Sequence, residues 1–190
     1  NKSEYIFYHN LDYDLFLEEK LKNNKIIKDK YAVFLDEANT NHPDNEKYFG
    51  TKGPVGDNYH LELNRFFKKI ENKFNLSVVI AAHPRNNFHS IENPFNPRKF
   101  IKNQTISLIK NSEFVITHSS TSANMAVIYT KPIVFISSKY YFKKYQISNL
   151  KFSGQLKKNA IDISNDNYDL SNVYKVEKKI YNLFFKNFIK

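Results

Sequence analysis

The chain has 190 residues, of which 29 are Lys or Arg and 19 are Asp or Glu, for a formal net charge of +10 at pH 7. It contains no Cys, which excludes disulfide scaffolds and cysteine-ligated metal sites. With 41% hydrophobic and 25% charged residues, its composition is that of a globular protein rather than a disordered one.

The positive charge does not by itself predict nucleic-acid binding. Nearly all the cations are Lys, with Arg only at positions 65, 85 and 98, and the chain is also rich in Asn, Ile, Tyr and Phe, as in proteins from low-GC genomes. No zinc finger, RNP motif or sustained basic helix accompanies the charge, so we expect no nucleic-acid partner. The first residues do not form a signal peptide, and we expect a cytoplasmic protein.

Hydrophobic periodicity predicts alternating strands and helices. Short continuous apolar runs indicate buried strands, and apolar residues at intervals of three or four indicate helices. In chain order the predicted elements are strand 5–8, helix 11–21, strand 31–35, helix 59–74, strand 76–82, helix 105–111, strand 114–117, helix 123–129, strand 133–136, strand 160–163 and a helix from Val173 onward. This rhythm predicts an α/β fold, a Rossmann-like parallel sheet with helices on both faces.

Two long segments between these elements are predicted to be loops. Residues 36–57 are longer than a passive connector needs, which makes them candidates for functional backbone. Asp57 or Asn58 would cap the helix that follows. Residues 86–103 contain Pro94 and Pro97 and are also expected to form a loop.

Polar side chains follow three of the predicted strands. Ligands of open parallel sheets bind outside the carboxyl ends of the strands, so we expect these residues to converge on one crevice. In chain order the clusters are Asp36-Glu37, His83-Pro84-Arg85 and His118-Ser119-Ser120-Thr121-Ser122.

The third cluster has the chemistry of an anion site. A strand that ends in small hydroxyl residues and opens a helix presents free backbone N–H groups. Ser119, Ser120, Thr121 and Ser122 can add hydroxyl donors to a phosphate. The alternative is that one of them only caps the helix.

The other two clusters supply a histidine and paired carboxylates. His83 can donate to a phosphate and Arg85 can add a fork of donors, although His83-Pro84 can also be a simple turn. Asp36 and Glu37 are candidates for a general base or a sugar ligand, and the alternative is a solvated turn.

Several common sites have no support in the sequence. His42 and Asp44 lie near the paired carboxylates, but their spacing matches no standard ligand pattern, so we expect no metal. No GxGxxG, Walker A, GxSxG or HExxH motif is present.

Taken together, the three clusters resemble the nucleotide-binding half of GT-B glycosyltransferases that build bacterial surface polysaccharides. The similarity is to sialyltransferases, polysialyltransferases and Kdo transferases, which carry a paired acidic motif, an HP motif and a serine motif in this order. It covers about residues 31–137 and rests on the segments FLDEANTNHPD, VVIAAHPR and FVITHSSTSANMAVIYTKPIVFI. The family's acidic motif commonly ends in Gly, where this chain has Ala38.

The resemblance implies a metal-independent glycosyltransferase without a cofactor. His83 would contact the donor phosphate, Ser119 and Ser120 would bind it, and Asp36 or Glu37 would activate the acceptor hydroxyl. The donor would be a CMP-linked sugar of sialic acid or Kdo type, and the acceptor a surface polysaccharide or lipooligosaccharide. Alternatively, Asp36-Glu37 is a donor-side loop and the base belongs to another domain.

A complete GT-B enzyme has two Rossmann-like domains, and 190 residues hold hardly more than one. We therefore expect residues 1–190 to form a single nucleotide-sugar-binding domain, either as a whole protein or as a fragment of a two-domain one. Two other functions remain open. A nucleotide-sugar 2-epimerase resembles GT-B proteins too, although its serine-glycine-glycine loop is missing here, and a non-catalytic nucleotide-binding module of a polysaccharide assembly complex would keep only the crevice.

The last residues, 174–190, alternate Lys with aromatic and aliphatic side chains. They would either make peripheral contact with an anionic membrane, on the inner face of the cell membrane, or form an ordinary terminal helix. In the second case the packed side chains would be Val176, Ile180, Leu183 and Phe184.

Overall fold

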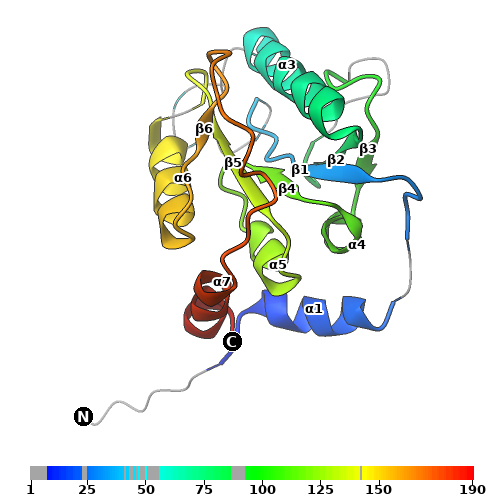
Figure 1. Ribbon diagram of the computed structural model, residues 1–190, viewed down its shortest axis with the longest axis vertical. Coiled ribbons are helices and arrows are strands. Elements are labelled where there is room, and N and C mark those ends of the chain that lie inside the picture. Colours follow the sequence, from blue (N-terminus) through cyan, green and yellow to red (C-terminus); the bar gives the residue numbers. More distant parts are fainter. Residues whose placement is uncertain are drawn as a thin grey trace.

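The computed structural model of the chain describes residues 8–22, 25–40, 42, 45, 47, 50, 56–86, 93–141 and 143–190, without the side chains of 56, 57 and 143–145. Six parallel strands form one sheet in the order β3-β2-β1-β4-β5-β6, and helices cover both of its faces (Figure 1). The predicted Rossmann-like α/β fold is therefore confirmed.

The strands form from continuous apolar runs of the sequence. Such runs can be buried on both faces of the sheet because they contain few polar side chains that need water. In chain order they are β1 (Tyr31–Leu35), β2 (Ser77–Ala82), β3 (Phe100–Lys102), β4 (Val115–Thr117), β5 (Ile133–Ser137) and β6 (Ile161–Asp162). The helices are α1 (Leu11–Lys20), α3 (Gly56–Phe74), α4 (Thr105–Asn111), α5 (Ala123–Ile128), α6 (Lys143–Gln155), α7 (Lys178–Phe184) and the π-helical η1 (Phe185–Ile189).

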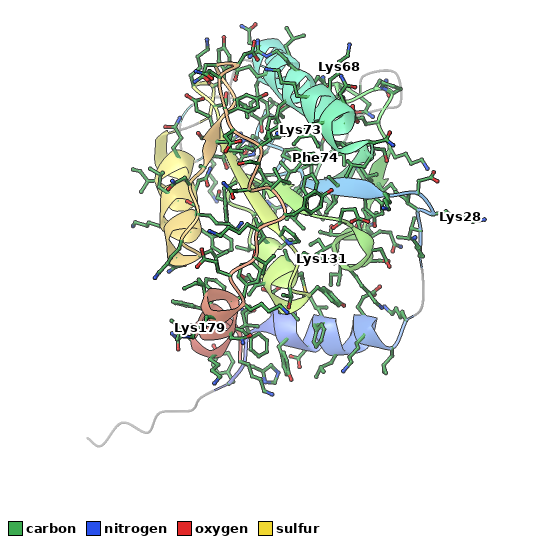
Figure 2. The ribbon with its side chains drawn as sticks, in the orientation of Figure 1. Lys28, Lys68, Lys73, Phe74, Lys131 and Lys179 are labelled. Carbon is green, nitrogen blue, oxygen red and sulfur yellow. The ribbon has the colours of Figure 1, made fainter. Side chains whose placement is uncertain are left out.

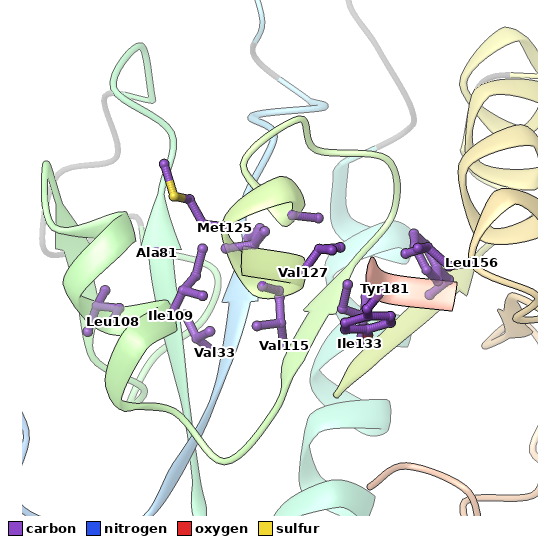
Figure 3. Close-up of a cluster of buried hydrophobic side chains, with 14 of the residues drawn as sticks. Val33, Ala81, Leu108, Ile109, Val115, Met125, Val127, Ile133, Leu156 and Tyr181 are labelled. Carbon is purple, nitrogen blue, oxygen red and sulfur yellow. The ribbon is translucent and has the colours of Figure 1, made fainter. Parts of the chain in front are cut away.

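Two hydrophobic cores lie on opposite faces of the sheet because successive strand residues point to opposite sides. Val33 of β1 belongs to the core covered by α1, α4, α5 and α7, which Figure 3 shows around Val115 and Ile133. Phe34 belongs to the other core, under α3. Figure 1 shows α3 across the sheet from α1, α5 and α7.

The strand order places a topological switch point at the centre of the sheet. From β1 the chain first proceeds outward through β2 to β3, and then returns to add β4, β5 and β6 on the other side of β1. Neighbouring connections therefore diverge between β1 and β4. In sheets of this kind, the gap between such carboxyl ends is where ligands bind.

Several predictions about the elements are wrong or incomplete. The helix predicted from Asp57 or Asn58 begins at Gly56, so neither residue is its N-cap. The loop predicted at 86–103 contains the short strand β3, and α6 had no counterpart among the predicted elements. Of the strand predicted at 5–8, residues 5–7 lie outside the described part of the chain, and Tyr8 is not in a strand.

The last helix begins at Lys178 instead of Val173 because residues 171–174 form a turn, closed by the hydrogen bond from the N–H of Lys175 to the carbonyl oxygen of Asn172, and residues 175–177 have no regular structure. Val173 is buried in the α3 core, and the Tyr174 ring packs edge-on against Phe74 and Phe114. Within α7, Phe184 is buried as predicted but Leu183 is 58% exposed.

No described helix combines the length and the apolar composition needed to cross a membrane. Lys28, Lys68 and Lys179 are exposed at separate places in Figure 2 and do not share one face.

Candidate functional site

Asp36 follows β1 directly and joins its end to the end of β2. Its Oδ2 atom accepts hydrogen bonds from the backbone N–H of His83 (3.2 Å) and from Nδ2 of Asn86 (2.8 Å). Its Oδ1 atom accepts from the N–H of Ala38 (3.0 Å), which closes a tight turn. The Asp36 carboxylate therefore fixes the loop after β2 against β1. This loop carries His83-Pro84-Arg85 and is called the HP loop below.

Glu37 joins the end of β1 to the ends of β4 and β5. Its Oε1 accepts from the backbone N–H of Ser119 (2.9 Å), and its Oε2 accepts from the hydroxyls of Tyr141 (3.0 Å) and Ser119 (3.3 Å). Burial raises the pKa of Glu37, and these three hydrogen bonds oppose that shift. Glu37 thus spans the switch point between β1 and β4 and holds Ser119. Residues 119–122, which follow β4, are called the serine loop below.

His118 lies beneath this network and is fully buried, with 0% of its surface exposed. Its ring stacks on Tyr141 at 4.3 Å between centroids, and its Nε2 lies 3.4 Å from the hydroxyl of Tyr59. That hydroxyl also accepts from Nδ2 of Asn39 (3.1 Å). Burial lowers the pKa of His118 to about 3, so the ring is neutral at physiological pH.

His83 occupies the loop after β2 with a defined tautomer. Its Nδ1 accepts the backbone N–H of Arg85 (3.2 Å), so in the neutral ring the proton resides on Nε2. Burial lowers the pKa of His83, and the nearby charges of His42 and Arg85 add to this effect while Asp36 opposes it. The result is a half-buried imidazole that can donate a hydrogen bond from Nε2 without carrying a charge.

The rest of the serine loop is more open than Ser119. The N–H of Ser120 donates to Oγ1 of Thr117 (3.2 Å), which holds the loop in the turn that precedes α5. Ser120 and Ser122 are half-buried and Thr121 is exposed. Among the described residues, the N–H groups of Thr121 and Ser122 and the hydroxyls of all three have no hydrogen-bond partner.

The structure thus brings Asp36, Glu37, His83 and Ser119 together at one edge of the sheet, as the sequence predicted. Pro84 and Arg85 are exposed at the same edge. The catalytic and binding roles of these residues stay predictions. His118 lies in the core, where a phosphate outside the sheet edge does not reach its ring.

Four residues of this network were not singled out as site residues from the sequence. Tyr59 is the first residue of the helix predicted at 59–74, and its hydroxyl reaches His118. Asn39 and Asn86 are both buried polar residues in loops that follow strands. Tyr141 lies beyond the predicted strand 133–136, and only the position after a strand end could have marked it.

Among the residues that the structure describes, no three His, Cys, Asp or Glu side chains lie close enough together to hold a metal ion. The rings of His42 and His83 face each other edge-on with centroids 5.2 Å apart. Asp44, named with His42 as a possible ligand, lies outside the described residues.

No protein-family model and no curated protein matches the chain. Among solved structures, it is similar to the glycosyltransferase SnogD from Streptomyces nogalater at 11% identity and a TM-score of 0.49, over 83% of this chain and 38% of that one. It is also similar to UDP-GlcNAc 2-epimerase from Methanocaldococcus jannaschii, solved with UDP-GlcNAc and UDP, at 14% identity and a TM-score of 0.43, over 92% of this chain and 47% of that one. The chain spans less than half the length of either protein. At these values the similarities assign no activity or substrate.

Ala38 provides a test of the turn after β1. Its φ of +50° lies in the left-handed region, which is unfavourable for residues that have a Cβ atom. Ala32, in the extended backbone of β1, is equally buried and serves as a matched control. Both Ala→Gly changes lose a buried methyl group, but only Ala38→Gly relieves strain. We expect Ala38→Gly to cost about 1 kcal/mol less than Ala32→Gly in urea unfolding. Equal losses would contradict the turn geometry.

The buried His118 predicts a pH-dependent stability. The folded chain keeps the ring neutral down to about pH 3, whereas the unfolded chain protonates near pH 6.5, so the unfolded state binds more protons in this interval. The free energy of unfolding should therefore fall as the pH falls, by about 1.4 kcal/mol per unit for one proton.

This contribution can be isolated with His118→Phe, which retains an aromatic ring but cannot titrate. Both proteins are unfolded in urea from pH 7 to pH 4. The free energy of unfolding of the natural chain, minus that of the variant, should fall by about 1.4 kcal/mol for each pH unit below pH 6.5. A difference that stays constant over this range would show that His118 is not held neutral by burial.

Proposed function

We propose that this chain binds a nucleotide-sugar in the crevice between β1 and β4 and acts in glycosyl transfer. The observation that carries the proposal is a pair of hydrogen bonds at the carboxyl end of β1. Asp36 accepts one from the N–H of His83 in the HP loop, and Glu37 accepts one from the N–H of Ser119 in the serine loop, so both loops are held at the switch point. Crevices at such points are the usual place for nucleotides in open parallel sheets. The resemblance of the three motifs to GT-B glycosyltransferases supports the same assignment.

The phosphate of the donor would lie between the HP loop and the serine loop. Ser119 N–H is already engaged by Glu37, so the groups available on the serine loop are the N–H groups of Thr121 and Ser122 and the neighbouring hydroxyls. His83 would donate from Nε2 on the opposite side. These fixed donors would stabilise the charge that builds on the phosphate as the sugar leaves, without a metal.

The reaction that fits this arrangement is direct displacement at the anomeric carbon. An acceptor oxygen forms a bond to that carbon while the bond from the carbon to the phosphate oxygen breaks, and the electron pair leaves with the nucleotide. The acceptor proton passes to a base. Following the resemblance, the donor is CMP-linked, the sugar is of sialic acid or Kdo type, and the acceptor is a surface glycan or glycolipid.

Asp36 and Glu37 act in this proposal as positioning residues, because their oxygens already accept hydrogen bonds from the chain itself. The base for the acceptor then lies outside this network. The same observation favours a second candidate, a nucleotide-binding module without transfer activity. Incubation with a CMP-sugar and a glycan acceptor separates the two, since the module would bind the donor and leave it intact.

Peripheral contact with an anionic membrane remains a prediction for the opposite end of the molecule. There Leu183 and Phe188 are exposed beside the lysines of the last helical turns. Sedimentation with anionic vesicles at low and moderate salt tests it, and no binding at either salt would end the idea.

The nucleotide proposal is tested by calorimetry of the full chain against CMP, UDP and GDP, with cytidine as the ligand that lacks a phosphate. We expect CMP to bind most tightly and cytidine to bind weakly. His83→Ala should weaken CMP binding by about tenfold, because it removes a hydrogen bond to a charged group worth about 1.5 kcal/mol or more. Cytidine binding should not change in that variant.

His9→Ala is the matched control, since His9 is a partly exposed histidine paired with Asp14 at the start of α1, away from the crevice. It should bind CMP like the natural chain. The proposal fails if no nucleotide binds, or if His83→Ala binds CMP as tightly as His9→Ala does.

A further inference from the structure

A cavity of about 450 Å³ lies beside the amino-terminal half of β5, at the other end of this strand from the edge that carries Asp36, Glu37, His83 and Ser119. Within the described residues, β6 pairs only with Ile136 and Ser137, so the edge of Ile133–Phe135 that faces away from β4 has no strand beside it. The loop after α6 and the segment 169–177, which descends to α7 in Figure 1, enclose the space next to this edge. The volume falls within the range of about 300–1,000 Å³ that is usual for small-molecule sites.

The wall of the cavity toward the sheet is apolar. It is formed by Val134 and Phe135 of β5, by Leu156 after α6 and by Val173. All four residues are at most 5% exposed; Phe135 and Leu156 belong to one core, and Val134 and Val173 belong to the other. Figure 3 shows Leu156 beside Ile133, where α6 ends against β5. This wall suits an apolar ring or a short chain.

The cavity is lined by three lysines, Lys157, Lys158 and Lys175, and by two acids, Asp169 and Glu177, so its lining carries an excess of one positive charge. Asp169 accepts hydrogen bonds from the N–H and hydroxyl of Ser171, and Glu177 pairs with Lys175 at 3.4 Å. Glu177 is therefore paired with a cation, whereas Asp169 is hydrogen-bonded to neutral groups and keeps its charge. Lys157 and Lys158, in contrast, have no carboxylate within 4.0 Å among the described residues.

Lys158 is half-buried, and its Nζ donates to the carbonyl oxygen of Lys175 at 2.9 Å, which leaves two ammonium protons without a described partner. Burial lowers the pKa of Lys158, and the charge of Glu177 only partly opposes this. Lys157 adopts a φ of +53°, a position after a helix where Gly or Asn is usual. An anion placed here would compensate a cation that the chain itself leaves partly desolvated.

We propose that this cavity is a second binding site, which takes a compact amphipathic anion. Its apolar body would lie on Phe135, Leu156 and Val173, and its carboxylate or phosphate would lie between Lys157 and Lys158. The site is separate from the nucleotide crevice and does not depend on the function proposed for that crevice.

The test uses naphthyl compounds as probes, because the chain contains no Trp and the naphthyl fluorescence is free of that background. 1-Naphthyl phosphate and 2-naphthoate represent the two head groups, and 1-naphthylmethylammonium is the cationic control. We expect both anions to bind saturably at one site per chain and the ammonium compound to bind at least about tenfold more weakly. Saturating CMP should not displace the anions.

Lys158→Gln should weaken anion binding by about tenfold, and Lys151→Gln, an exposed lysine on α6 outside the cavity, should leave it unchanged. Thermal unfolding establishes that both variants are folded. The proposal is overturned if neither anion binds, if the ammonium compound binds equally well, if both variants weaken binding alike, or if CMP displaces the probe.

Discussion

Asp36 and Glu37 are adjacent carboxylates at the end of the central strand, and the arrangement of the whole carboxyl edge depends on them. Asp36 holds the backbone of His83, and Glu37 holds the backbone of Ser119 and the hydroxyl of Tyr141. Each tie joins segments that lie between 47 and 104 residues apart in sequence. Other described contacts of the loop after β1 at this edge are the ring pair of His42 and His83 and the path from Asn39 through the hydroxyl of Tyr59 to His118.

The Glu37 network explains why buried polar groups are tolerated at this edge. A carboxylate taken out of water is costly unless its oxygens are hydrogen-bonded, and here three donors reach them. The aromatic rings of Tyr141 and Phe34 surround the neutral His118, whose Nδ1 has no partner in the described part of the chain. Oδ1 of Asn86 is likewise buried without a described partner. Such unsatisfied atoms cost stability, and these costs are often retained where an arrangement serves binding.

Much of the sheet could be predicted because its strands are continuous apolar runs, as in Tyr31–Leu35. β3 was missed because it has only three residues, all half-buried. α6 was not predicted because its apolar residues do not mark its buried face. Ile147 and Leu150 are exposed, whereas Asn149 and Ser153 are buried, and Asn149 donates to the carbonyl oxygen of Ile136.

The candidate site was predictable in position but not in its contacts. The place of His83 and Ser119 after buried strands was enough to predict that they converge. That Glu37 would meet Tyr141 depends on the packing of two loops 104 residues apart, which no local pattern encodes. The burial of His118 was also hidden, because a histidine directly after a strand end can point either outward or into the core.

Amide-resolved NMR of the chain during a titration with CMP tests most directly whether the two loops form one site. If Asp36 and Glu37 hold them together at a nucleotide crevice, the N–H signals of His83, Thr121 and Ser122 should shift in parallel and yield one dissociation constant. Shifts confined to one loop, or two loops with different dissociation constants, would contradict a single site at the switch point.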